Sequence, residues 1–99
     1  MFNITETREG KHLILALSGR FDAETSPELE EIIKNGLDGV DRLVFDLSDL
    51  DYISSAGLRV LLEAKKVMLE QGKMTVRNPS NDVKEILKIT GFSKILNVT

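Results

Sequence analysis

The sequence predicts one α/β domain, residues 1–99, with a mixed sheet of four to five strands flanked by helices. The chain has 99 residues, and at roughly 100–200 residues per domain it has room for one domain. Short apolar runs typical of buried strands alternate with segments whose apolar residues recur at helical spacing. A helix-length segment separates two of these runs, which is the pattern of a βαβ unit.

The start of the chain predicts a β-hairpin. Phe2 and Ile4 alternate with polar residues, as in an edge strand, and Glu9-Gly10-Lys11 is typical of a tight turn. From His12 to Leu17 nearly every side chain is apolar. That run predicts a central strand covered on both faces, which Gly19 closes.

The first helix is expected to begin at Ser26. The Ser26 hydroxyl can cap free amides, Pro27 suits the first helical position, and Glu28 complements the positive end of the helix dipole. Gly36 and Gly39 mark its end. Its expected apolar stripe is Leu29, Ile32, Ile33 and Leu37, and the next buried strand contains Leu43, Val44, Phe45 and Leu47.

Residues 48–55 are expected to form a loop before a second helix, which ends at Gly72. A strand with Met74 and Val76 follows, and residues 78–81 form a turn that can cap a last helix, which Gly91 stops. The stripe of the second helix is Leu58, Val60, Leu61, Leu62, Ala64, Val67, Met68 and Leu69. The buried face of the last helix is Val83, Ile86, Leu87 and Ile89, and Ile95, Leu96 and Val98 are expected to add a short final strand.

Composition argues against several classes of protein. The chain has no Cys, so disulfides, thiolate catalysis and sulfur-ligated zinc are excluded. A net charge of -3 argues against direct nucleic-acid binding. Neither an apolar run long enough to cross a bilayer nor a secretory leader is evident. We therefore expect a cytoplasmic protein without membrane insertion.

Catalysis has no visible apparatus in this sequence. His12 is the only histidine, which excludes a metal site built from imidazoles, and no Gly-rich phosphate loop is present. Asp22 and Asp46 are a conceivable carboxylate pair, but nothing in the sequence fixes their separation. We expect no enzyme activity, no cofactor and no metal, with an enzyme or small-nucleotide binder as the alternative from another class.

One segment, residues 47–58, places two adjacent hydroxyls and a glycine at the entrance of a helix. Either Ser54 or Ser55 can accept a hydrogen bond from the first free amides, which stabilises a helix by about 1 kcal/mol. Gly57 can permit close packing. A helix cap is the simplest interpretation of these residues.

The stretch from Asp46 to Leu62, DLSDLDYISSAGLRVLL, resembles the signature of STAS domains, in particular of the bacterial anti-sigma factor antagonists. Gly19-Arg20-Phe21-Asp22, followed by Thr25, is similar to the turn after the second strand in that family. Ile89-Thr90-Gly91-Phe92 resembles its terminal motif. The resemblance spans nearly the whole chain and implies a STAS-type domain.

The resemblance implies a switch rather than a catalyst. In such antagonists an anti-sigma factor that is also a GHKL-type serine kinase phosphorylates a serine at this helix entrance, and a phosphatase reverses the modification. The unphosphorylated form binds the anti-sigma factor and frees the sigma factor. By position the acceptor is Ser55, and Ser54 stands where the best-known members have aspartate. The implied partner-binding surface is Asp22, Ala23, Glu24, Thr25, Ser54, Ser55, Gly57, Arg59 and Glu63.

Electrostatics makes this switch plausible. A phosphoserine at a helix N-terminus adds about 1.5 to 2 negative charges where the dipole favours an anion, so the fold should tolerate it. Asp22 and Thr25 have a purely structural alternative, the organisation of a turn, and Arg59 and Glu63 could form an i,i+4 ion pair. The alternative function is a STAS interaction module of a transport-associated or signalling complex, without phosphorylation.

Overall fold

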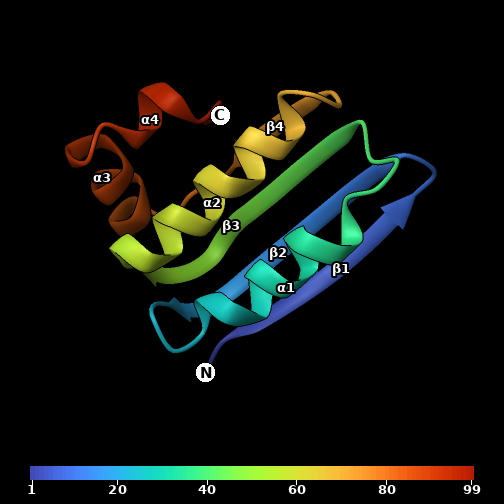
Figure 1. The fold of residues 1–99 in the computed structure, drawn as a ribbon. Helices are drawn as coiled ribbons and strands as arrows, with labels where there is room; N and C mark the ends of the chain where they lie inside the picture. The colour runs from blue at the N-terminus through green and yellow to red at the C-terminus, as the bar shows by residue number, and fades with distance from the viewer.

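The computed structural model describes residues 1–99 and contains a four-stranded mixed sheet in the order β1-β2-β3-β4 (Figure 1). Strands β1 and β2 form an antiparallel hairpin, whereas β2, β3 and β4 run parallel. The strands are β1 (Asn3–Glu9), β2 (His12–Phe21), β3 (Arg42–Ile53) and β4 (Lys73–Arg77). The helices are α1 (Ser26–Gly36), α2 (Ser55–Met68), α3 (Asn81–Ile89) and α4 (Phe92–Ile95).

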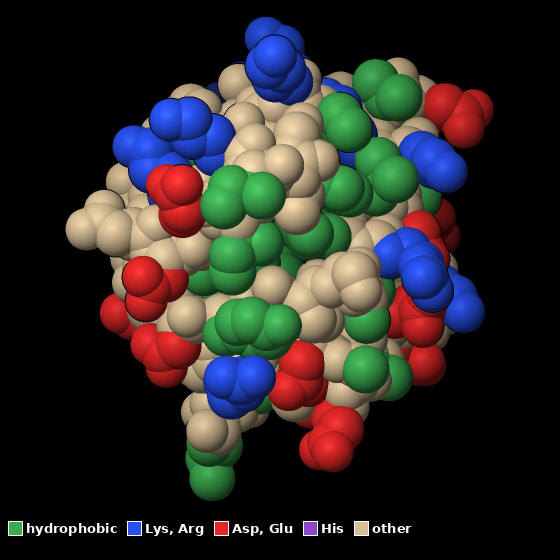
Figure 2. All heavy atoms as spheres, turned by 90° about the vertical axis from the view of Figure 1, so that its left-hand side faces the viewer, with side chains coloured by type: hydrophobic (Ala, Val, Ile, Leu, Met, Phe, Trp, Pro, Cys, Tyr) green, Lys and Arg blue, Asp and Glu red, His purple; other side chains and the backbone are tan.

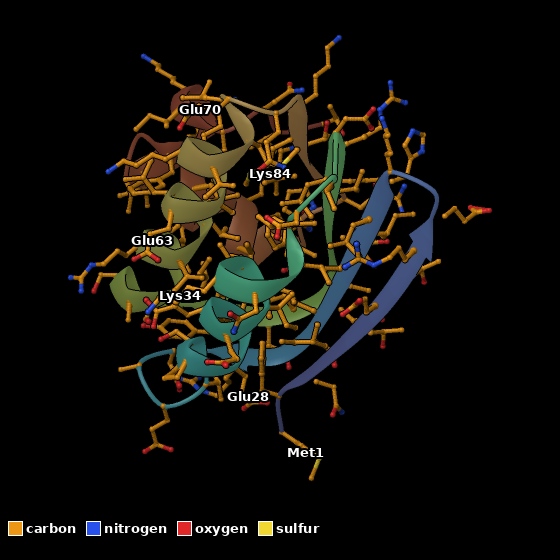
Figure 3. The ribbon with its side chains drawn as sticks, turned by 45° about the vertical axis from the view of Figure 1, so that its right-hand side comes forward. Met1, Glu28, Lys34, Glu63, Glu70 and Lys84 are labelled. Atoms are coloured by element: carbon orange, nitrogen blue, oxygen red, sulfur yellow. The ribbon has the colours of Figure 1, made fainter.

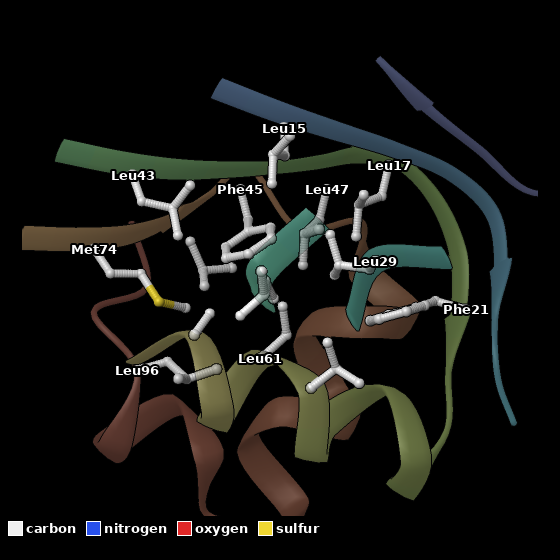
Figure 4. Close-up of a cluster of buried hydrophobic side chains, with 14 of the residues drawn as sticks. Leu15, Leu17, Phe21, Leu29, Leu43, Phe45, Leu47, Leu61, Met74 and Leu96 are labelled. Carbon is white, nitrogen blue, oxygen red and sulfur yellow. The ribbon is translucent and has the colours of Figure 1, made fainter. Parts of the chain in front are cut away.

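The helices cover one face of the sheet and leave the other open (Figures 1 and 4). Leu13 and Leu15 of β2 are 0% exposed, whereas the alternate residues Ile14 and Ala16 are only half-buried. The expectation that this strand is covered on both faces is therefore wrong. Both crossover helices, α1 and α2, pack on the same face of the sheet. The alternate side chains of each strand point to the other face and therefore remain partly exposed to solvent.

The core between the sheet and the helices is a cluster of 24 buried hydrophobic residues. Burying each large apolar side chain contributes roughly 1.5–3 kcal/mol, which makes this cluster the main source of stability. In Figure 4, Phe21 lies at one end of the displayed cluster and Met74 and Leu96 lie toward the other. The predicted stripe of the first helix is confirmed, with Leu29, Ile33 and Leu37 buried and Ile32 packed at the margin.

Strand β3 is longer than the sequence predicts. Residues 48–53, expected to be loop, continue the pairing with β2, from Ser18↔Asp49 to Phe21↔Ile53. Two register shifts interrupt this part of the ladder. Each inserts one extra residue in β3, as a β-bulge does, so the simple alternation of buried and exposed side chains is lost.

Two apolar side chains at helix ends were expected to be buried and are exposed. Helix α2 ends at Met68, one turn before Gly72, and leaves Leu69 69% exposed. Ile89, the last residue of α3, is 76% exposed. In both places the chain turns away before the side chain can reach the core.

The C-terminal segment also differs from expectation. Ile95 belongs to the short helix α4 rather than to a strand, and only a single bridge, Val76↔Val98, joins the chain end to the sheet. The turn before α3 is confirmed, because the Ser80 hydroxyl accepts a hydrogen bond from the Val83 amide at 3.4 Å. No helix combines the length and the apolar character that a membrane crossing requires.

Candidate functional site

The predicted site lies where the parallel strands β2 and β3 end. Phe21 and Ile53 are the last residues of the two strands and are paired in register. The Ser54 amide donates to the Phe21 carbonyl oxygen at 2.9 Å, which ties the two strand ends together. The loop at residues 22–25 and the entrance of α2 therefore lie at one edge of the sheet, as Figure 1 shows.

The two serines at this edge have different tasks. Ser54 is the N-cap of α2, and its hydroxyl oxygen accepts a hydrogen bond from the Gly57 amide at 3.3 Å. Ser55 is the first helical residue, is exposed, and makes no side-chain hydrogen bond. The structure thus assigns the cap to Ser54 and leaves the Ser55 hydroxyl free. An aspartate at position 54 could cap in the same way.

Replacing Ser54 by alanine should destabilise the protein by about 1 kcal/mol, because the Gly57 amide loses its acceptor. In a domain of this size that corresponds to about 4–8 °C in Tm. Ser54→Asp should restore most of the loss, and Ser55→Ala should remain within about 0.5 kcal/mol of the parent. Urea titration of the three variants tests this, and equal losses for the two alanine variants would contradict the assignment of the cap.

The loop between β2 and α1 is organised by its own side chains. The Asp22 carboxylate accepts from the amides of Glu24 and Thr25 at 3.0 and 3.3 Å. The Thr25 hydroxyl accepts from the Asp22 amide and donates to the Arg20 carbonyl, each at 2.9 Å. Asp22 and Thr25 thus hold the turn, whereas Ala23 and Glu24 are exposed at its tip.

Helix α1 begins at Ser26 as predicted, but its cap differs from the prediction. Its N-cap is Thr25, which makes no side-chain cap hydrogen bond, and Ser26 lies inside the helix and is buried. The Ser26 amide donates to the Asp22 carbonyl oxygen at 2.8 Å. The predicted cap by Ser26 is therefore wrong, because the residues around Asp22 satisfy the first free amides instead. Pro27 occupies the first turn as expected.

Gly57 brings the first turn of α2 into direct contact with β2. A Cβ at this position would lie 2.8 Å from Phe21 Cδ2 and 2.9 Å from the Phe21 carbonyl oxygen. A third neighbour, Ile53 Cγ1, would be 3.0 Å away. The predicted packing role of Gly57 is confirmed, because no larger residue fits without moving the helix.

Two further predicted residues, Arg59 and Glu63, lie along α2. Arg59 is exposed and Glu63 is half-buried on the outer side of the helix, where Figure 3 shows it directed away from the sheet. No ion pair joins them, although their spacing allows one. Both side chains are thus left without a partner within the chain.

Three residues at this edge lie in the quoted motifs but were not predicted as site residues: Arg20, Phe21 and Tyr52. Phe21 is 0% exposed and contacts both halves of the site. Arg20 lies with its guanidinium 4.3 Å from the centre of the Tyr52 ring and 3.8 Å from the Asp22 carboxylate. The pairing of Arg20 with Tyr52 across a bulged ladder was not evident from the sequence, whereas an apolar residue before the Asp22 turn was a usable signal for Phe21.

Figure 2 shows the face of the molecule that is turned toward the left in Figure 1, where α2 begins and α3 lies. Hydrophobic side chains gather across its middle, and acidic side chains are prominent over its lower half. Such a surface, with an apolar centre and charged margins, has the general composition of protein-binding surfaces.

The two carboxylates that could have formed a catalytic pair lie apart. Asp46 pairs with Ala16 in the β2–β3 ladder and Asp22 follows the end of β2, so they are about 20 Å apart along the strand. Asp46 contacts Arg77 at 3.2 Å and accepts from the Ser48 amide at 3.1 Å. Partial burial raises the pKa of Asp46, but the hydrogen bonds from Ser48 and the charge of Arg77 outweigh it, so the pKa is lowered overall.

The lowered pKa of Asp46 predicts a contribution to acid stability. A carboxylate whose pKa is lower in the folded state stabilises the fold above its unfolded pKa of 3.8 and loses that contribution as pH falls further. Asp46→Asn should therefore cost roughly 0.2–1 kcal/mol at pH 7, the range for such accessible ion pairs. The difference between parent and variant should be constant down to about pH 5 and shrink below pH 4 in urea titrations. A difference that does not change with pH would contradict the charge effect.

The match to a known family decides the identity of the fold. The sequence model of the STAS domain matches residues 3–99. The chain belongs to the STAS domain family. The predicted resemblance is confirmed, and it covers the sheet, the helices and the edge that carries Ser55.

Relatives of this STAS domain include proteins named as anti-sigma factor antagonists. BtrV of Bordetella bronchiseptica, which is named in this way, is 41% identical over 88 residues, covering 87% of this chain and 76% of BtrV. The anti-sigma-B factor antagonist of Staphylococcus aureus strain NCTC 8325 is 26% identical over 98 residues, covering 97% of this chain and 91% of that protein.

Solved structures of the same fold superpose closely on this STAS domain. An anti-sigma factor antagonist from Mycobacterium paratuberculosis matches 99% of this chain and 85% of its own with a TM-score of 0.88 at 22% identity. SpoIIAA in its unphosphorylated form matches 100% of this chain and 87% of its own, with a TM-score of 0.77 at 16% identity. Phosphorylated SpoIIAA of Bacillus has a TM-score of 0.75 at 15% identity, and the match covers 100% of this chain and 91% of its own. The predicted mixed sheet with flanking helices is confirmed.

Proposed function

We propose that this STAS domain is an anti-sigma factor antagonist controlled by phosphorylation. Its unphosphorylated form binds an anti-sigma factor, which is also a serine kinase of GHKL type, and thereby releases a sigma factor. The kinase transfers the γ-phosphoryl group of ATP to Ser55. A bond forms between Ser55 Oγ and the γ-phosphorus while the bond from that phosphorus to the β–γ bridging oxygen breaks. ADP leaves with the bridging oxygen, and the hydroxyl proton is released to solvent. A phosphatase hydrolyses the ester and restores binding.

One observation carries the proposal: the Ser55 side chain is exposed and free of hydrogen bonds at the first position of α2. A phosphoryl group there breaks no bond of the fold, and the helix dipole favours the added negative charge by roughly 0.3–1 kcal/mol. Ser54 is the poorer acceptor, because it is half-buried and its oxygen already accepts the Gly57 amide. The names of the relatives support the choice of partner.

The surface proposed for the partner surrounds Ser55. The exposed tip at Ala23 and Glu24, held by Asp22 and Thr25, lies on one side. Arg59 and Glu63, which have no ion partner within the chain, extend the surface along α2. Ser54 and Gly57 set the position of the helix end rather than offer free groups. Phosphorylation of Ser55 changes the charge of this surface and leaves its shape unchanged.

Incubation of the purified protein with ATP and a GHKL-type anti-sigma factor kinase from the same genome tests the proposal. Intact mass and peptide mapping should show one added phosphoryl group on Ser55, and Ser55→Ala should prevent it. Modification of Ser54 would contradict the residue assignment. Tight binding without modification of either serine would support an interaction module without phosphorylation, and absence of both binding and modification would overturn the proposed function.

A further inference from the structure

Phe2, which precedes β1, reaches the same edge of the sheet that carries Ser55. Its ring stacks on that of Phe21, with the ring centres 5.4 Å apart and the planes inclined by only 9°. Both side chains are buried, at 8% and 0% exposed. Stacked aromatic pairs are worth more than the area they bury, because their ring geometry is specific.

Gly19 makes room for the segment that carries Phe2. Its φ is +87°, and a Cβ at Gly19 would collide with the Met1 carbonyl group. The Met1 carbonyl group therefore lies directly against the backbone of β2 at this point. In Figures 1 and 3 the N-terminus lies at the same edge as the loop between β2 and α1.

Phe21 contacts the start of α2 at Ser54 and Gly57. Its Cδ2 edge borders Gly57, and its carbonyl oxygen accepts the Ser54 amide at 2.9 Å. The next residue in the chain, Asp22, organises the loop at residues 22–25. Because the Phe21 ring borders Gly57, a shift of that ring would move the first turn of α2.

We propose that Phe2 is a positioning residue for the Ser55 site: by stacking on Phe21 it holds that ring against Gly57 and fixes the first turn of α2. The role at Ser55 rests on the proposed function, whereas the effect on the helix turn does not. In this proposal Phe2 acts through Phe21, the ring on which it stacks. Loss of the ring should therefore loosen the turn without removing any group that the partner contacts.

A matched pair of core variants separates this role from general destabilisation. Phe2→Ala removes the stack, whereas Leu96→Ala removes a side chain that is 2% exposed and lies away from Phe21 in the displayed cluster (Figure 4). Phe2→Leu keeps apolar volume without a ring, which provides a milder variant should Phe2→Ala unfold. Phe2→Tyr keeps the ring and should restore the behaviour of the parent.

The first measurement is amide hydrogen exchange at Ser54, Gly57 and Leu58, whose amides donate to Phe21 O, Ser54 Oγ and Ser54 O respectively. Phe2→Ala and Phe2→Leu should accelerate exchange there at least about fivefold beyond Leu96→Ala, measured relative to amides in the last turn of α2. Equal acceleration in the Phe2 and Leu96 variants, or none in the Phe2 variants, would overturn the positioning role.

The second measurement is the affinity for the anti-sigma factor and the initial rate of Ser55 phosphorylation. Phe2→Ala and Phe2→Leu should weaken binding at least about fivefold, whereas Leu96→Ala and Phe2→Tyr should not. Unchanged binding in the Phe2 variants would refute the link to Ser55. If the parent protein itself neither binds nor becomes phosphorylated, the proposed function fails, while the exchange measurement still decides whether Phe2 positions the helix turn.

Discussion

Phosphorylation of Ser55 should weaken binding of the anti-sigma factor by about a hundredfold or more. A phosphoserine carries about 1.5 to 2 negative charges at pH 7. Opposed to one carboxylate of the partner at about 6 Å, with an effective dielectric constant near 20, each unit charge costs about 3 kcal/mol. Because 1.4 kcal/mol corresponds to tenfold in Kd, one such repulsion releases a partner bound with micromolar affinity.

Two variants of nearly equal size separate charge from bulk at this position. Ser55→Glu adds a negative charge and should weaken binding strongly, whereas Ser55→Gln adds similar volume without charge and should weaken it far less. Both should fold like the parent, because Ser55 is exposed and makes no side-chain hydrogen bond. Calorimetric titration with the anti-sigma factor at two salt concentrations measures the effect, which should shrink at higher salt. Equal losses of affinity in the Ser55→Glu and Ser55→Gln variants would point to a steric mechanism instead.

Replacing Gly57 by alanine should destabilise the protein by about 1–3 kcal/mol and also weaken partner binding. Alanine is intrinsically the better helix former by up to about 1 kcal/mol. Its Cβ, however, would lie 2.9 Å from the Phe21 carbonyl oxygen, a backbone atom that no change of rotamer can move. The collision therefore outweighs the gain in helix propensity, and α2 must move away from β2.

The matched control for this substitution is Gly36→Ala in α1. A Cβ at Gly36 would have its nearest neighbours at 3.6 and 3.7 Å, which is ordinary contact. That variant should be neutral or more stable by up to about 1 kcal/mol. Thermal unfolding distinguishes the two, with Tm expected to fall by at least about 4 °C for Gly57→Ala. A neutral Gly57→Ala variant would show that the helix end tolerates displacement.

Local sequence patterns were sufficient for most of the fold. The hairpin around Gly10, the apolar stripe of α1 and a capping turn at residues 78–81 were predicted because each depends on residues close in sequence. Strand β3 was not predicted beyond Leu47. Its buried residues Leu47, Leu50 and Ile53 recur every third position, because bulges against β2 insert extra residues. A spacing of three does not match the alternation expected of a strand.

The candidate site, like the fold, was predicted from the sequence only in part. The sequence by itself determined that two hydroxyls and a glycine stand at the start of a helix after a buried strand. Only the tertiary structure decided that Ser54 caps the helix and Ser55 stays free, because the Phe21 carbonyl binds the Ser54 amide and fixes where the helix begins. The stack of Phe2 on Phe21 joins residues far apart in the chain. Local propensity carries no information about such a contact, which exists only because β1 pairs with β2.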